Sequence, residues 1–181
     1  MIRSSITVVE PGTAIETPSI NDAPQTPGFD AQPEPRPANV VIPTNGIALA
    51  EVVAEGGLEY QTVSMELTDA GFTPAIVVVQ AGLETEWVIG NQSTGSENSA
   101  LLVPAYSTAL RLESGENPLY LFPAESFEFS NGDSSFYGFV KVVDDLQEID
   151  IEAIKLEVAA FEPLIYPPEF FNGAGGGAGC H

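Results

Sequence analysis

The chain has 181 residues, of which 44% are apolar, enough for the core of one domain of ordinary size with extensions. Its 26 acidic residues outnumber its 5 Lys and Arg residues and give a net charge of −21. Because phosphates and anionic lipids bind clustered cations, this charge excludes a nucleic-acid partner and disfavours a membrane surface. We interpret the excess acid as a source of solubility and of repulsion between copies, with a calcium-binding surface as the alternative.

Residues 1–10 contain a short strand signal, in which Ile6, Val8 and Val9 are β-branched. Residues 11–50 are rich in Pro and acid, a composition typical of a semi-rigid extended spacer or of disorder. No apolar run in the chain is long enough to span a membrane, so we expect no direct membrane insertion.

Residues 51–145 alternate short apolar runs with turn signals, and this pattern predicts a sandwich of antiparallel strands. Two polar loops, at residues 91–98 and 131–135, interrupt the strands. The predicted strands cover residues 60–68, 75–80, 84–89, 100–103, 109–112, 118–122, 127–129 and 136–143.

Residues 146–172 are predicted to hold one helix followed by an extended aromatic segment. Asp145 and Glu148 have the spacing of a capping box, apolar residues then recur at helical spacing, and Pro163 ends the run. Residues 173–181 form a Gly-rich tail that ends in Cys180 and His181. The expected fold class is all-β: a Greek-key antiparallel β-sandwich with an extra N-terminal strand, a Pro-rich spacer and one C-terminal helix.

Four segments in order carry a family resemblance: residues 68–74 (TDAGFTP), 77–82 (VVVQAG), 86–89 (EWVI) and 138–145 (GFVKVVDD). With them, residues 67–145 resemble the cupredoxin-like domains in the C-terminal extracytoplasmic regions of sulfite-exporter-like (TauE/SafE) bacterial membrane proteins. The resemblance covers under half of the chain. It implies a cupredoxin-like sandwich.

The copper ligands that this family would use are absent. A blue-copper site needs two His, one Cys and usually an axial Met. At the positions that the resemblance gives to Cys and Met, this chain has Glu97, Asn131, Asp133 and Ser135. Such oxygen groups do not suit copper. Glu97, Asn131 and Asp133 could hold a hard cation such as calcium, but two carboxylates favour the simpler interpretation that these residues cap turns.

The N-terminal residues 1–10 align with residues 135–144, the last strand of the sandwich. The chain therefore contains two versions of a final strand but one sandwich. Because an unpaired strand is costly, the first version is expected to pair with its own sandwich or with the edge of a neighbouring copy. The third alternative is that it is a fragment boundary that pairs with nothing.

Cys180 and His181 leave several alternatives open. Residues 177–181 resemble a haem attachment site whose first Cys is replaced by Gly177. The pair could also supply two ligands to a metal shared between chains, or Cys180 could cross-link two chains. The simplest alternative, which we favour, is a tail without a ligand.

No constellation for catalysis can be built, because the only His is the last residue. We expect a non-catalytic extracellular or cell-surface module without a cofactor, which self-associates through Ile6, Val8 and Val9 into an oligomer or filament. The alternative is a metal-binding or electron-transfer protein that holds copper, calcium or haem, through Cys180 and His181 or through the oxygen groups of the sandwich.

Overall fold

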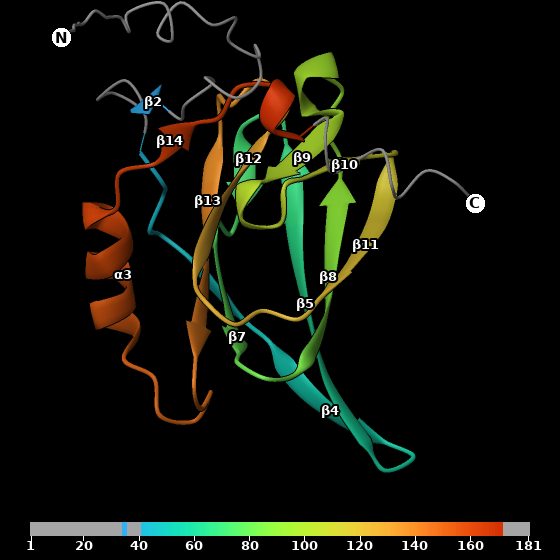
Figure 1. Cartoon of the computed structure of the whole chain (residues 1–181), viewed down its shortest axis with the longest axis vertical. Coiled ribbons are helices and arrows are strands. Elements are labelled where there is room, and N and C mark those ends of the chain that lie inside the picture. The colour runs from blue at the N-terminus through green and yellow to red at the C-terminus, as the bar shows by residue number, and fades with distance from the viewer. Residues whose placement is uncertain (1–33, 36–40, 172–181) are drawn as a thin grey trace, which may run out of the picture. The chain divides into compact units, whose positions relative to one another are not determined.

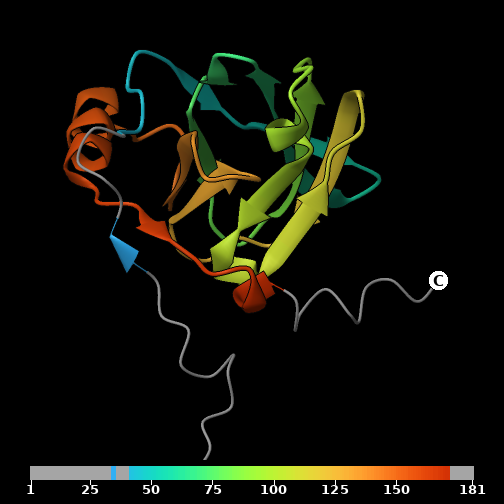
Figure 2. The ribbon, with the colours of Figure 1, turned by 90° about the horizontal axis from the view of Figure 1, so that it is seen from above.

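The computed structural model describes residues 34–35 and 41–171. Most of this part of the chain is β-strand, arranged as two sheets that enclose one core, with helix α3 beside them (Figures 1 and 2). The prediction of an all-β sandwich is therefore confirmed. No helix in these ranges is long and apolar enough to cross a membrane.

The first sheet has six strands in the order β10-β9-β12-β13-β7-β3. Its strands are β3 (Ile47–Leu49), β7 (Ile76–Gln80), β9 (Ala100–Val103), β10 (Thr108–Arg111), β12 (Phe127–Asn131) and β13 (Tyr137–Val143). The second sheet has the order β11-β8-β5-β4, and β6 also pairs with β5. Its strands are β4 (Glu51–Glu55), β5 (Leu58–Thr68), β6 (Gly71–Thr73), β8 (Glu84–Asn91) and β11 (Gly115–Leu121).

The sheets are mixed: the sandwich is as predicted, but three of its strand pairs are parallel rather than antiparallel. β5 runs parallel to β8, and β7 runs parallel to both β13 and β3. The reason is the route of the chain. Between β5 and β8 the chain crosses to the other sheet to form β7, so it returns to β8 in its original direction. A parallel pair needs such a crossover, and turn signals in the sequence do not reveal it.

The sandwich begins earlier than residue 51, inside the predicted spacer. Ile42 is buried in the core, and β3 pairs with β7 in the first sheet. At Ala50 the chain changes sheets: its N–H donates to the carbonyl of Val78 at 2.9 Å, and the next strand, β4, pairs with β5 in the second sheet. One extended segment thus ties the two sheets together along one side.

Aromatic rings fill the centre of the core. Trp87 on β8 lies across the sandwich from Phe129 on β12, with ring centroids 4.8 Å apart in an edge-to-face arrangement. Phe72 contacts the same Phe129 ring at 4.9 Å. Such packing joins strands of both sheets around one cluster.

Helix α3 begins at Ile151, five residues later than predicted, and ends at Ala160. Asp150 is the cap, and its Oδ1 accepts from the N–H of Ala153 at 3.0 Å. Asp145 instead holds a tight turn, in which its Oδ1 accepts from the N–H of Gln147 at 2.8 Å. An acidic side chain favours a turn as well as a cap, so the capping-box spacing of Asp145 did not by itself place the start of the helix.

The outer face of α3 is exposed and its inner face packs on β13. Ile154 and Val158 belong to the core, and Phe161 contacts Phe139 with ring centroids 4.9 Å apart. At the edge of this contact, Lys141 Nζ lies 2.8 Å from Glu157 Oε2.

The aromatic segment after the helix is extended only in part. Strand β14 (Leu164–Ile165) pairs with β2 (Glu34–Pro35), which lies within the predicted spacer. Leu164 also binds the sandwich: its N–H donates to Glu128 and its carbonyl accepts from the hydroxyl of Tyr137 at 2.8 Å. Residues 169–171 form a helical turn.

Candidate functional site

Two buried amides meet where the resemblance would place metal ligands. Asn131 ends β12, and Asn98 ends a short 3₁₀ helix (Ser96–Asn98) in the preceding polar loop. The Nδ2 of Asn131 donates to the Oδ1 of Asn98 at 2.7 Å. Both side chains are buried, so this contact fixes the two polar loops against each other.

The hydrogen-bonding capacity of this pair is used. Asn131 Oδ1 accepts from the N–H groups of Ser135 and Phe136, each at 2.9 Å. Asn98 Nδ2 donates to the hydroxyl of Ser93 at 2.7 Å. In turn, the Ser93 hydroxyl donates to Asp69 at 2.5 Å. We call Asp69, Ser93, Asn98, Asn131 and Ser135 the amide network.

The amide network also sets the charge of its outermost member. The hydrogen bond from Ser93, followed by the bond from the N–H of Thr94, holds the pKa of Asp69 below its ordinary value. The negative form of Asp69 is therefore the form that the loop stabilises.

The candidate cation ligands Glu97, Asn131 and Asp133 do not form an oxygen cage. Glu97 and Asp133 are exposed, and Asp133 accepts from the N–H and the hydroxyl of Ser135. The oxygen of Asn131 is committed to two backbone donors. Within the described ranges, no group of three or more His, Cys, Asp or Glu side chains could hold a metal ion. Amides and hydroxyls also do not fit copper, which prefers thiolate, thioether and imidazole.

The other predicted functional residues lie outside the described part of the chain. These are Ile6, Val8 and Val9 of the N-terminal strand signal, and Cys180 and His181 at the C-terminus.

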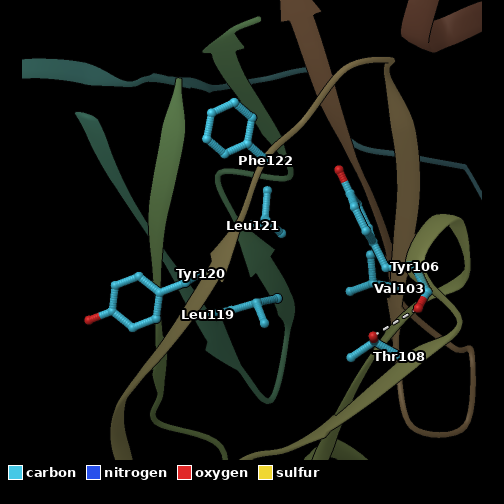
Figure 3. A pocket seen from close by; sticks show the side chains of 7 residues that line it. All are labelled: Val103, Tyr106, Thr108, Leu119, Tyr120, Leu121 and Phe122. Carbon is cyan, nitrogen blue, oxygen red and sulfur yellow. Dashed lines mark hydrogen bonds between the residues drawn. The ribbon is translucent and has the colours of Figure 1, made fainter. Parts of the chain in front are cut away.

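A second feature was not predicted: an apolar hollow of about 230 Å³ between the end strands of the two sheets. β10 ends the first sheet and β11 ends the second. Figure 3 shows Leu119 on β11 facing Val103 and Thr108 across this hollow. The residues that line it are Val103, Tyr106, Thr108, Leu119, Tyr120, Leu121 and Phe122.

The hollow lies among exposed aromatic side chains. Tyr106, Tyr120 and Phe122 have exposed fractions of 37%, 59% and 62%. Leu119 and Leu121 alternate with them along the chain and pack partly against the core. The sequence predicted a strand at residues 118–122, but it did not indicate that both sheets end here.

Glutamates lie beside the hydroxyl of Tyr120, which points away from the hollow in Figure 3. The hydroxyl of Tyr120 donates to Glu86 Oε2 at 3.1 Å. This hydrogen bond, together with the charges of Glu86 and Glu84, raises the pKa of Tyr120. Burial raises the pKa of Tyr106 on the opposite wall. Both tyrosines therefore stay neutral at physiological pH.

The hollow is better suited to apolar side chains than to a small-molecule ligand. Sites for small molecules have volumes of about 300–1,000 Å³ and place several polar groups around the ligand. At about 230 Å³ the hollow is smaller, and its floor is made by Val103, Leu119 and Leu121.

Comparison with known proteins adds little to this description. No protein-family profile matches the sequence, and a search of curated proteins found no match. One similar solved structure is the metal-binding domain of the Cu(I)-exporting P-type ATPase CopA of Streptococcus pneumoniae D39, with Cu(I). The two chains are 21% identical, the match covers 54% of this chain and 96% of that chain, and the TM-score is 0.48. Another is an apo copper-binding protein solved by NMR: 20% identity over 52% and 95%, TM-score 0.46. At these scores the likeness carries no argument about function.

Proposed function

We propose that this chain is a non-catalytic structural or interaction module, which acts outside the cell or at its surface and associates with copies of itself by strand addition. Ile6, Val8 and Val9 form the strand that is added. The observation that carries the proposal is the apolar hollow between β10 and β11. These are the end strands of the two sheets, and in the described part of the chain each leaves one edge of its backbone unpaired. Such edges accept strands from other chains.

The amide network supports a non-catalytic role. In this network the buried side chains hydrogen-bond to one another and to the backbone, so none is held ready for a substrate or a metal. Buried polar groups in this state fix a loop conformation. The resemblance of residues 67–145 to extracytoplasmic domains supports the location.

The sequence of residues 1–10 supports the mode of association. It aligns with the segment that contains β13, and β13 is paired on both sides, with β12 and with β7. A second segment of this type is thus suited to sheet pairing, while the sandwich already has its own final strand.

The experiment is deletion of residues 1–10 from the full chain. We expect the native chain to form an oligomer and the shortened chain to be monomeric, as measured by light scattering. The double variant Ile6→Asp, Val8→Asp should have the same effect, because a charged side chain cannot be buried cheaply in an interface. Its matched control is Ser4→Asp, Ser5→Asp, which adds the same charge beside the apolar positions. An unchanged oligomer mass after the deletion contradicts the proposal.

The alternative function, metal binding or electron transfer through Cys180 and His181, rests on sequence alone. Elemental analysis of the purified full chain tests it. Stoichiometric copper, zinc, calcium or iron that is lost in the variant Cys180→Ser, His181→Ala would favour this alternative.

A further inference from the structure

We infer that the hollow between β10 and β11 is the seat that receives residues 6–9 of a second copy, which joins β10 as a seventh strand of the first sheet. The inference rests on the proposed function and adds the place of contact. It commits to one occupant, the N-terminal segment of another chain.

The backbone of the two end strands favours β10 over β11. Pro118 lies within β11 and has no N–H, so a strand beside β11 would lose one backbone donor. β10 (Thr108–Arg111) contains no Pro and has four residues, the same length as residues 6–9. Among the described residues, no strand pairs with its outer side.

The side chains of the incoming segment match the hollow. Alternate residues of a strand face the same side, so Ile6 and Val8 would point together while Thr7 points away. Beside β10, that side faces Leu119 and Leu121 across the hollow. Two branched aliphatic side chains suit a space of about 230 Å³ that is too small for most ligands.

Charge distinguishes this segment from the rest of the chain. Residues 2–9 contain Arg3 and no acidic residue, although the chain as a whole has 26 acids and 5 Lys and Arg. Glu84 and Glu86 lie close to Tyr120, one of the residues that line the hollow, and raise its pKa. Arg3 would thus approach a part of the molecule that carries two glutamates, and complementary charge steers such encounters.

The connecting segment is long enough to reach a neighbour. The chain is held to its own sandwich at β2. A Pro-rich segment extends about 3.1 Å per residue, so residues 10–33 can span about 70 Å. A domain of roughly 130 residues has a radius of gyration of about 14 Å. The span therefore exceeds the size of one sandwich.

The experiment mixes two full-length variants. The donor variant carries Ile6→Asp and Val8→Asp, which alter the strand that is added, and it keeps a native hollow. The acceptor variant carries Tyr106→Asp, which alters the hollow, and it keeps a native N-terminal segment. We expect each variant alone to associate at least tenfold more weakly than the native chain, and the equimolar mixture to form a dimer with one chain of each kind, as measured by light scattering and native mass spectrometry.

Two further variants keep the result interpretable. Phe122→Asp changes the other side of the hollow at a side chain that is 62% exposed, so it should weaken association without affecting folding. Leu156→Asp places the same charge on α3 at a side chain that is 73% exposed, and it should associate like the native chain. Near-ultraviolet circular dichroism of Trp87 checks that each variant is folded.

The outcomes separate the inference from the proposed function. If Tyr106→Asp and Phe122→Asp associate like the native chain while the donor variant is monomeric, strand addition stands and the hollow is not the seat. A native chain that is monomeric, or a donor variant that associates normally, overturns both. If the mixture stays monomeric, the N-terminal segment of one copy does not add to the hollow of the other, and the inference is overturned.

Discussion

Asn98 and Asn131 connect two polar loops that are distant in sequence. The resemblance drawn from the sequence implied metal ligands in these loops. Here an amide hydrogen bond of 2.7 Å joins the loops instead, and both side chains are buried. Removing one of the two amides then lowers the free energy of unfolding by more than the hydrogen bond contributes, because the other amide stays buried and unsatisfied.

We expect Asn131→Ala to destabilise the fold by about 2–6 kcal/mol, because it leaves the Asn98 oxygen and the N–H of Phe136 without a partner, at about 1–3 kcal/mol for each unsatisfied group. Urea unfolding followed by the fluorescence of Trp87 measures this. Asp133→Ala, in the same loop but exposed, should cost under about 1 kcal/mol. Equal losses in the two variants would contradict a structural role for the amide pair.

At the scale of elements, strands that alternate or lie wholly in the core were predictable. β9 was predicted at residues 100–103, where the structure has it, and β8 was predicted only two residues short. Period-two patterning places these strands because one face of each is buried. β3 and β4 were missed: β3 is three residues long, and the side chains of β4 are mostly exposed, so neither shows a clear pattern.

The candidate site was likewise predictable only in part. The resemblance drew attention to Asn131, for which a turn cap was favoured over a cation ligand, and in the structure its oxygen accepts from two N–H groups of the following turn. The hollow could not be predicted, because it depends on which strands end the two sheets. That is a property of the topology, and residues 100–122 show no local signal for it.

The start of helix α3 gives a prediction at this scale. Asp150→Ala should destabilise the protein by about 1 kcal/mol, the usual cost of losing an N-cap. Asp145→Ala removes only the exposed turn contact to Gln147 and should cost less. Thermal unfolding of the two variants compares them. A larger loss for Asp145→Ala would place the functional cap at the earlier position.

At the scale of the whole molecule, the proposed self-association would bring together chains that each carry a net charge of −21. Salt shortens the range of this repulsion, from about 30 Å at 0.01 M to about 8 Å at 0.15 M. We therefore expect the oligomer to dissociate less readily as sodium chloride rises over this range, as measured by sedimentation velocity.

Arg3→Gln is the control for this salt dependence. It removes the one cation of the N-terminal segment, so it should weaken association more at 0.01 M than at 0.15 M salt. Weaker association of the native chain at higher salt would show that attraction between Arg3 and acidic side chains outweighs repulsion between the chains.

The pairing of β2 with β14 has a mechanical consequence. Glu34 pairs with Ile165 and Pro35 with Leu164, so the chain enters and leaves this short ladder at the same end. Tension applied through the two flanks would peel the ladder apart one hydrogen bond at a time, at low force, before any load reached the six-stranded sheet. In an assembly of the proposed kind, tension would separate β2 from β14 first. The connection between two copies would then lengthen while each sandwich stayed folded.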